Sequence, residues 1–305
     1  MAERSAEGEF RSGFVCFVGR PNTGKSTLTN ALVGAKIAIT SSRPQTTRHT
    51  IRGIVHREHA QLILVDTPGL HRPRTLLGQR LNDLVRDTYS EVDVIALCIP
   101  ADEKIGPGDR WIVQQVRQMA PKTTLLGVVT KTDKVGRDRI AEQLLAVSQL
   151  LGPEAEIVPV SAVKGEQVEV LVDVIAAQMP EGPAFYPDGE LTDEPEETLM
   201  AELIREAALE GVRDELPHSL AVVIEEVLPR EGREDMLDVH ALLYVERPSQ
   251  KAIVIGKGGS RLKEVGTNAR KQIEHILGTR IYLNLHVKVA KDWQRDPKQL
   301  GKLGF

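Results

Sequence analysis

The chain has 305 residues, of which 41% are hydrophobic and 27% are charged, and this is enough for two ordinary domains with hydrophobic cores. Its two cysteines, Cys16 and Cys98, each lie in an apolar run, which favours buried thiols in a reducing compartment over a disulfide framework. The lack of any run of 18 apolar residues, and of any stretch like a signal peptide, argues against a membrane-spanning helix and a secretion signal. We therefore expect a soluble, cytoplasmic protein, and peripheral contact with the cytoplasmic face of the cell membrane is left open.

The net charge of −4 hides a strong asymmetry along the chain. Residues 1–184 carry +1, residues 185–250 carry −13 and residues 251–305 carry +8. A basic block of this size is a candidate surface for an anionic partner such as a nucleic acid, although a charged run can also be only a solvated face.

The first 180 residues alternate between short apolar strands and helical patterns. This alternation predicts a doubly wound, mostly parallel sheet with ligand loops at the carboxyl ends of its strands. The expected strands are Phe14–Val18, Gln61–Asp66, Val92–Ile99, Thr124–Thr130 and Glu156–Val160, and the expected helices cover about 25–33, 79–89, 108–119, 138–150 and 165–179.

A break in this pattern follows at residues 179–189, which contain three prolines and two glycines and are typical of a linker. Beyond it the pattern predicts a smaller α+β unit. Its expected elements are a helix over 196–216, strands over 220–228 and 236–246, a short helix after Ser249, a helix over 260–277 and a strand over 281–289.

A glycine-rich loop, Gly19-x4-Gly24-Lys25-Ser26-Thr27, separates the first expected strand from the first expected helix. Glycines let the backbone approach a phosphate closely, and the start of a helix directs N–H groups at it. Lys25 would neutralise β- and γ-phosphate oxygens, and the Ser26 hydroxyl would bind Mg²⁺. The motif in this context predicts a nucleoside triphosphate site.

Two further strand ends carry matching polar motifs. Asp66-Thr67-Pro68-Gly69 supplies a carboxylate that can hold Mg²⁺ through water and a Gly69 N–H that can sense the γ-phosphate. In Thr130-Lys131-Thr132-Asp133, the Asp133 carboxylate can accept the N1–H and 2-amino groups of guanine, which adenine lacks. Lys131 can pack along the base, and Ser161-Ala162 can present N–H groups to the guanine O6. The expected ligands are therefore GTP and GDP.

A second glycine loop, Gly256-Lys257-Gly258-Gly259, lies in the basic block between two expected helices that are followed by a strand. This order is typical of a KH domain, whose GxxG loop presses against a nucleic-acid backbone. Lys251, Lys257, Arg261 and Lys263 would supply positive potential, and Ile253, Val254 and Ile255 would line an apolar groove for bases.

These motifs resemble the translation-factor-related GTPases, and the second half narrows the resemblance to the Era family of bacterial ribosome-assembly GTPases. The resemblance covers nearly the whole chain, including Gln45-Thr46-Thr47-Arg48, the Arg205-Glu206 helix with Glu215-Leu216-Pro217, and Val254 to Gly259. It implies a P-loop GTPase domain followed by an α+β type II KH domain that recognises the 3′ end of 16S rRNA during maturation of the 30S subunit. The implied organisation is a tail over 1–12, the GTPase domain over 13–180, a linker over 181–197, the KH domain over 198–290 and a tail over 291–305, in a monomer.

Two positions depart from the commonest GTPase pattern. Thr130 stands where Asn is usual, so we expect slightly weaker nucleotide binding with specificity kept by Asp133. Leu70 stands where Ras-like proteins have the glutamine that orients water, and leucine cannot do so.

Similar GTPases with Asn at the place of Asn22 use a monovalent cation, so we expect stimulation by K⁺. Thr47, or alternatively Thr46, is expected to contact Mg²⁺ and the γ-phosphate.

The candidate site residues fall into four sets. GTP binding is assigned to Gly19, Arg20, Pro21, Asn22, Thr23, Gly24, Lys25, Ser26, Thr27, Asp66, Thr67, Pro68, Gly69, Leu70, Thr130, Lys131, Thr132, Asp133, Ser161 and Ala162. Catalytic roles are assigned to Lys25, Asn22, Thr47 and Gly69, and Mg²⁺ ligation to Ser26, Thr47 and Asp66. RNA binding is assigned to Lys251, Ile253, Ile255, Gly256, Lys257, Gly258, Gly259, Arg261 and Lys263.

The motifs support a switch in which GTP orders residues 40–50 and 66–78 and so changes how the KH domain meets RNA. One alternative is an RNA chaperone or assembly checkpoint in which hydrolysis only resets binding. A metabolic phosphotransferase is disfavoured, because no Asp or His motif that could activate an acceptor accompanies the phosphate loop.

Overall fold

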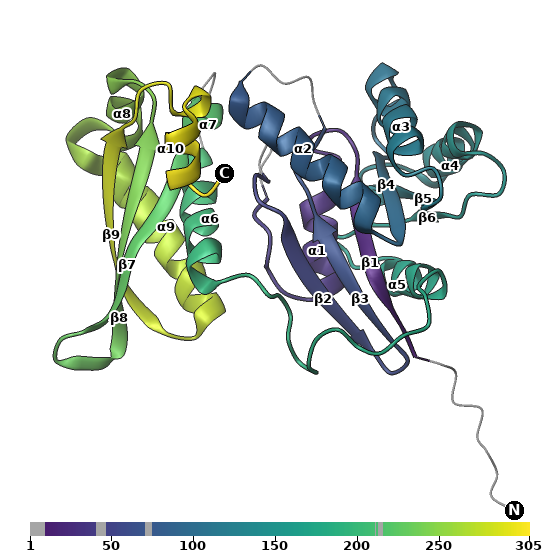
Figure 1. Cartoon of the computed structure of the whole chain (residues 1–305), viewed down its shortest axis with the longest axis horizontal. Coiled ribbons are helices and arrows are strands. Elements are labelled where there is room, and N and C mark those ends of the chain that lie inside the picture. The colour runs from purple at the N-terminus through teal and green to yellow at the C-terminus, as the bar shows by residue number, and fades with distance from the viewer. Residues whose placement is uncertain (1–9, 41–46, 71–74, 211, 213–215) are drawn as a thin grey trace, which may run out of the picture. The chain divides into compact units, whose positions relative to one another are not determined.

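The computed structural model describes residues 10–40, 47–70, 75–210, 212 and 216–305 (Figure 1). These residues form two compact units. The described residues of unit 1 fall within Met1–Ala38, Thr47–Leu70 and Asn82–Asp193, and those of unit 2 fall within Ile39–Thr46, His71–Leu81 and Glu194–Phe305.

Unit 1 contains a six-stranded sheet with the strand order β2-β3-β1-β4-β5-β6. All neighbouring strands are parallel except β2, which pairs antiparallel with β3. Its elements are β1 (Arg11–Val18), α1 (Lys25–Val33), β2 (Ile51–Arg57), β3 (Ala60–Asp66), α2 (Leu76–Glu91, which begins in unit 2), β4 (Val94–Pro100), α3 (Pro107–Met119), β5 (Thr124–Thr130), η1 (Thr132–Lys134), α4 (Arg137–Leu151), β6 (Ile157–Pro159) and α5 (Val168–Ala177). The predicted doubly wound sheet is confirmed.

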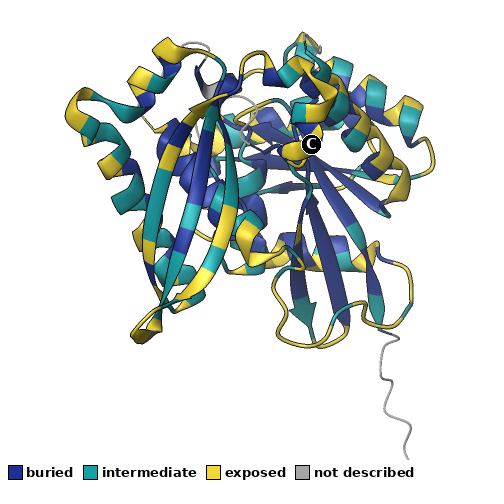
Figure 2. Cartoon of the chain, turned by 60° about the vertical axis from the view of Figure 1, so that its left-hand side comes forward, coloured by how far each residue is buried: buried dark blue, intermediate teal, exposed yellow. Residues whose placement is uncertain are grey.

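Helices cover both faces of this sheet, as the continuous apolar strands require. Val15 and Phe17 of β1 pack with α1 and α5, whereas Cys16 and Val18 face the helices α2, α3 and α4. Every residue of β3 and β4 is buried (Figure 2). Strands buried on both faces read as unbroken apolar runs, which explains why the sequence predicts them well.

The sequence pattern does not predict β2, the antiparallel edge strand. Its apolar residues are interrupted by exposed Arg52 and by Gly53, where a Cβ would lie 2.5 Å from the Ile37 side chain. Residues 181–193, expected to be a linker, pack along unit 1: the Ile54 N–H donates to the Leu191 carbonyl, and the Gln61 side chain bonds the Tyr186 main chain. The irregular segment therefore belongs to the first unit.

Unit 2 contains a three-stranded sheet in which β8 pairs antiparallel with β7 and parallel with β9. Its elements are α6 (Glu196–Leu209), α7 (Leu216–Ser219), β7 (Ala221–Arg230), β8 (Arg233–Val245), α8 (Pro248–Ile255), η2 (Lys257–Gly259), α9 (Ser260–Leu277), β9 (Arg280–Val289), η3 (Trp293–Arg295) and α10 (Pro297–Lys302). This order confirms the predicted α+β KH fold.

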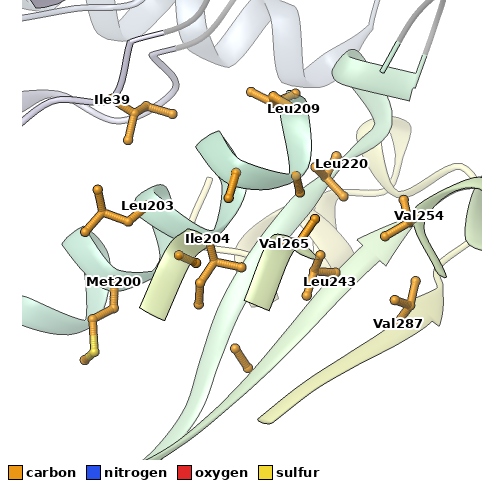
Figure 3. Close-up of a cluster of buried hydrophobic side chains, with 14 of the residues drawn as sticks. Ile39, Met200, Leu203, Ile204, Leu209, Leu220, Leu243, Val254, Val265 and Val287 are labelled. Carbon is orange, nitrogen blue, oxygen red and sulfur yellow. The ribbon is translucent and has the colours of Figure 1, made fainter. Parts of the chain in front are cut away.

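The core of unit 2 lies between α6, α9 and one face of the sheet (Figure 3). Val265, Ala269 and Ile273 recur every four residues on α9 and place one face of that helix in the core. Ile39, which lies eight residues before Thr47 in the sequence, belongs to the same cluster.

The C-terminal segment, residues 291–305, folds instead of trailing as the expected tail. The Trp293 indole N–H donates to the Ser219 carbonyl at 2.9 Å, and its ring stacks on Phe305. Asp296 caps α10, and Leu300 is fully buried. These side chains cover Ala221 of β7, which lies on the sheet face away from α6 and α9.

None of the helices in the described part of the chain has the length and apolar character that a membrane crossing requires.

Candidate functional site

The phosphate loop, residues 19–27, joins the end of β1 to the start of α1. Gly24 precedes the helix with a φ of 95°, and it has no side chain that could cap the first turn. A Cβ on Gly19 would lie 2.6 Å from the Cys98 carbonyl oxygen, so only glycine fits there. The uncapped N–H groups of α1 are therefore available to bind phosphate, as the sequence motif predicts.

Lys25 is buried inside the phosphate loop. Its Nζ donates to the main-chain oxygens of Gly19 at 3.1 Å and Arg20 at 2.9 Å. Burial lowers the pKa of this ammonium group, and the nearby Asp66 carboxylate opposes that shift. Because phosphate oxygens carry negative charge and carbonyl oxygens are neutral, phosphate oxygens would replace the two carbonyls as partners of the ammonium group.

The three predicted Mg²⁺ ligands meet at one point. Asp66 Oδ2 accepts from Ser26 Oγ at 2.7 Å and from Thr47 Oγ1 at 3.3 Å, and the two hydroxyl oxygens lie 3.2 Å apart. Asp66 is fully buried, and this burial raises the pKa of its carboxyl group. Its Oδ1 has no hydrogen-bond partner within the described residues. Hard oxygen ligands around an unsatisfied carboxylate oxygen fit Mg²⁺.

Gly69 lies beside the phosphate loop: a Cβ on it would be 3.7 Å from the Gly19 carbonyl oxygen and 3.9 Å from Lys25 Nζ. This placement suits contact between the Gly69 main chain and a terminal phosphate. The Leu70 side chain is buried in the hydrophobic cluster that also contains Val85 and Tyr89. This side chain therefore cannot orient an attacking water. The residues that follow it, 71–74, lie outside the described part of the chain.

Asp133 lies beyond the end of β5, next to the turn that follows β6. Its Oδ1 accepts a hydrogen bond from Ser161 Oγ at 2.7 Å, which fixes the carboxylate. The Ser161 N–H donates to the Glu166 carbonyl, so a contact with guanine O6 would fall to the Ala162 N–H. Lys131 adopts a left-handed backbone conformation with a φ of 57°.

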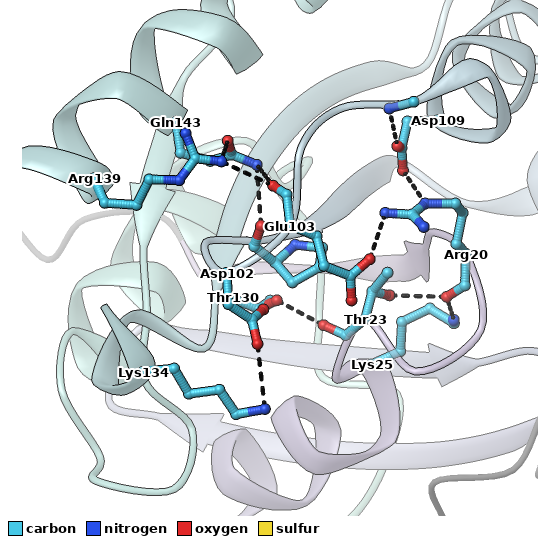
Figure 4. A network of polar contacts seen from close by, with 12 residues as sticks. Arg20, Thr23, Lys25, Asp102, Glu103, Asp109, Thr130, Lys134, Arg139 and Gln143 are labelled. Carbon is cyan, nitrogen blue, oxygen red and sulfur yellow. Dashed lines mark hydrogen bonds and ion pairs between the residues drawn. The ribbon is translucent and has the colours of Figure 1, made fainter. Parts of the chain in front are cut away.

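Thr130 links this guanine-reading loop to the phosphate loop. Its buried hydroxyl donates to the Thr23 carbonyl at 2.6 Å (Figure 4). The hydroxyl therefore ties the two loops together, a contact that the presence of Thr in place of Asn does not by itself predict.

Arg20 and Asn22 lie in the phosphate loop with side chains in different settings. The Arg20 side chain bonds Glu103 and Asp109, so only its main chain is placed to meet a nucleotide (Figure 4). Asn22 is exposed and has a φ of 64°.

In unit 2, the GxxG loop lies between α8 and α9. Gly256, Gly258 and Gly259 all have positive φ values, and Lys257 is exposed. Among the described residues, no atom would lie within 4 Å of a Cβ on Gly258 or Gly259, so the surface beside them is open. The loop can therefore approach a nucleic-acid backbone closely.

A cavity of about 320 Å³ extends from this loop between α9 and β9, and we call it the α9–β9 groove. It is lined by Gly259, Leu262, Lys263, Gly266, Thr267, Arg270, Tyr282, Leu283 and Leu285. The sequence motifs identify only Gly259 and Lys263 of this set, because the others lie on two elements that the fold brings together. The Arg230 guanidinium lies 4.4 Å over the Tyr282 ring and limits its freedom.

Two expected RNA-contact residues have other roles. Val254 is buried in the core of unit 2, because it lies on the inner face of α8, so its assignment to the groove is wrong. Arg261 donates to the carbonyls of Ala208 and Glu210 and so closes the end of α6. Ile253 is 53% exposed, while Ile255 packs partly against the core.

Two family models match this architecture. A model described as 50S ribosome-binding GTPase matches residues 14–131, and a KH-domain model matches residues 215–294. GTPase Era of Mycolicibacterium smegmatis is 80% identical over 297 residues, which cover 97% of this chain and 99% of that protein. The chain belongs to the Era family of GTPases. GTPase Era of Mycobacterium bovis is 75% identical over 298 residues with the same coverage.

Solved structures of the Era family have the same fold. Era in complex with MgGDPNP and nucleotides 1506–1542 of 16S ribosomal RNA aligns with a TM-score of 0.92 at 39% identity. A single-residue variant of Aquifex aeolicus Era bound to GDP and AlF4⁻ aligns with a TM-score of 0.92 at 38% identity. Each alignment covers 97% of this chain and 99% of the other. The predicted family is confirmed.

The Thr130 hydroxyl gives the first testable prediction. Thr130→Val keeps the side-chain shape but leaves the Thr23 carbonyl without its buried donor, which should weaken GDP binding about 10-fold. Thr130→Ser keeps the hydroxyl and should bind GDP within about twofold of wild type. Titration with fluorescent GDP measures both affinities, and equal affinities for wild type and Thr130→Val would show that this link does not support nucleotide binding.

Proposed function

We propose that this chain is a GTP-hydrolysing switch that binds 16S rRNA through its KH domain and assists assembly of the 30S ribosomal subunit. Its membership of the Era family supports hydrolysis of GTP to GDP and phosphate. The related Era structure with a 16S rRNA fragment, together with the α9–β9 groove described above, supports rRNA as the nucleic-acid partner.

One observation carries the idea of a switch: segments next to the nucleotide site belong to the same unit as the KH elements. Thr40 donates from its main-chain N at 2.7 Å and from its hydroxyl at 3.2 Å to Glu206 Oε1 of α6. Ile39 is buried in the same core as Leu203. Thr47, a proposed Mg²⁺ ligand, lies seven residues after Thr40. A change in the bound nucleotide would therefore reach α6 through a short stretch of chain.

The start of α2, which follows the Asp66–Gly69 loop, makes a second contact of this kind. Leu77 and Leu81 pack with Trp293 and Leu300 of the C-terminal segment, and Arg80 donates to the main-chain oxygen of Phe305. We propose that GTP orders residues 40–50 and 66–78, of which 41–46 and 71–74 lie outside the described residues, and thereby alters these contacts.

The residues of unit 1 have defined roles in this proposal. Ser26, Thr47 and Asp66 would hold Mg²⁺, which neutralises charge on the phosphate oxygens. Lys25 would bind β- and γ-phosphate oxygens, the Gly69 N–H would sense the γ-phosphate, and Asp133 would select guanine.

Because the Leu70 side chain is buried and apolar, it cannot orient the attacking water. We therefore propose that hydrolysis also depends on K⁺ bound near Asn22, whose exposed position at the rim of the phosphate loop suits that role. The cation would supply positive charge where an arginine finger acts in other GTPases.

For the RNA, the GxxG loop would contact the sugar-phosphate backbone while the α9–β9 groove receives bases. The proposed contact set omits Arg261, whose guanidinium bonds the end of α6, and adds Arg270 and Tyr282. It keeps Lys251, Ile253, Ile255, Gly256, Lys257, Gly258, Gly259 and Lys263. Leu262, Leu283 and Leu285 give the groove an apolar floor, so base packing adds to the electrostatic attraction. We further propose a cytoplasmic monomer, with contact to the cytoplasmic face of the membrane as the open alternative.

Stimulation of hydrolysis by RNA tests the proposed function. A 16S rRNA fragment that covers nucleotides 1506–1542 should raise the single-turnover rate of GTP hydrolysis several-fold if the two sites cooperate. Arg270→Gln, in the groove, should weaken RNA binding by about 1 kcal/mol or more, whereas Lys271→Gln, with the same charge change outside the groove lining, should weaken it less. RNA binding without any stimulation would favour the alternative of a checkpoint in which hydrolysis only resets binding.

Replacement of K⁺ by Na⁺ tests the proposed cation. Single-turnover hydrolysis by the wild type should be about 10-fold faster in K⁺ than in Na⁺ at equal ionic strength, because one more positive charge stabilises the transition state. Asn22→Ala should reduce this ratio towards one. Equal wild-type rates in the two salts would exclude a role for K⁺.

A further inference from the structure

Arg20 connects two parts of unit 1 through its main chain and its side chain. Its main-chain oxygen accepts hydrogen bonds from Lys25 Nζ at 2.9 Å and Thr23 Oγ1 at 3.0 Å, inside the phosphate loop. Its guanidinium group points the other way, to the loop between β4 and α3 (Figure 4). One residue thus joins the phosphate-binding backbone to a neighbouring helix.

The guanidinium partners are two carboxylates that are themselves held in place. Arg20 Nε donates to Asp109 Oδ1 and Arg20 Nη2 donates to Glu103 Oε2, both at 2.8 Å. The Asp109 side chain is only 1% exposed, and its Oδ2 accepts from the Gly106 N–H at the start of α3. The hydrogen bond to Asp109 is the main cause that raises the pKa of Arg20. The carboxylate position is therefore set by the helix rather than by the arginine.

Glu103 is anchored from its opposite side. Its main-chain oxygen accepts hydrogen bonds from Gln143 Nε2 at 2.9 Å and from Arg139 Nη2 at 3.2 Å, both on α4. Gln143 is buried and also donates to the Pro100 carbonyl. At Gly108, a Cβ would lie 3.0 Å from Arg20 Cδ, so the arginine stem rests closely on the first turn of α3. The phosphate loop is thereby tied to α3 and α4.

We propose that Arg20 is a positioning residue for nucleotide retention, which holds the phosphate loop in its binding conformation through Asp109 and Glu103 and so slows the release of GDP. A loop that is already ordered loses less conformational entropy when it binds, which strengthens binding. The loop N–H groups contact phosphates in the ground state and in the transition state alike, so this is uniform binding. The inference deepens the proposed function, because it takes GTP and GDP as the ligands.

Release of fluorescent GDP, chased with excess unlabelled GDP, tests the proposal in the full-length chain. Arg20→Ala should release GDP about 10-fold faster, and Arg20→Lys, which keeps the charge but not the forked geometry, should fall in between. Glu103→Gln, at a half-exposed loop position, should show a smaller change in the same direction and does not depend on tolerance of a buried substitution. In Glu103→Gln, which lies outside the assigned nucleotide-binding residues, the rate of single-turnover GTP hydrolysis at saturating GTP should stay within about twofold of wild type.

Two further readouts separate positioning from loss of structure. Asp109→Asn can still accept from the Gly106 N–H, and its effect combined with Arg20→Ala should be no larger than that of Arg20→Ala alone. Choline chloride should accelerate GDP release from the wild type more than from Arg20→Ala, because salt screens this partly exposed ion pair in addition to the phosphate contacts that both proteins share.

Three results would overturn the proposal: unchanged release in both Arg20→Ala and Glu103→Gln, additive effects in the double variant, or hydrolysis by Glu103→Gln slowed as much as its release of GDP is accelerated. If the wild type retained no GDP, the proposed function itself would fail, and this inference would fail with it.

Discussion

The hydrogen bonds of the buried Asp66 carboxylate are the interactions on which the arrangement of the nucleotide site depends. Asp66 stands at the carboxyl end of β3 and binds the hydroxyls of Ser26 and Thr47, which come from different segments of the chain. Burial raises the pKa of its carboxyl group, and one carboxylate oxygen has no hydrogen-bond partner within the described residues. A buried carboxylate with an unsatisfied oxygen lowers the stability of the fold unless that oxygen has a partner. A proposed site for Mg²⁺ would supply this partner and explain the buried Asp66.

This cluster sits where a parallel sheet collects its ligand loops, and the surrounding backbone is held from several sides. Thr130 ties the guanine loop to the phosphate loop, while Arg20 ties the phosphate loop to α3. Thr47 also lies close in sequence to Thr40, whose hydrogen bonds reach Glu206 of α6. In the proposed switch, occupancy of the nucleotide site would therefore act on α6, a helix that contributes to the core of unit 2.

The sequence predicts the fold class and brings out most of the candidate nucleotide site, because the phosphate loop, Asp66 and Asp133 form short motifs at the ends of strongly apolar strands. It does not predict features that depend on residues far apart in the chain. Arg20 bonds Asp109 only because β1 and β4 are neighbours in the sheet. Tyr282 and Arg270 line one groove only because β9 packs beside α9. The edge strand β2 escapes prediction because Arg52 and Gly53 interrupt its apolar pattern.

The fold of the C-terminal segment is also not predicted from the sequence. Its short mixture of basic and apolar residues resembles a tail, but Trp293 and Leu300 are fully buried. Val254 illustrates a local limit: a run of three apolar residues does not reveal which of them faces the core. Thr130 illustrates a chemical limit, because the residue type alone does not show that its hydroxyl reaches the Thr23 carbonyl. In each case the missing information is a tertiary contact rather than a propensity.

The central claim is that nucleotide state and RNA binding are coupled through the contact of Thr40 with Glu206. The direct measurement is the affinity for the 16S rRNA fragment in the presence of GDPNP and of GDP, for the wild type, Glu206→Ala and the exposed control Glu210→Ala. We expect the two nucleotides to give affinities at least about fivefold apart in the wild type and in Glu210→Ala, and nearly equal affinities in Glu206→Ala. An unchanged ratio in Glu206→Ala would contradict the claim.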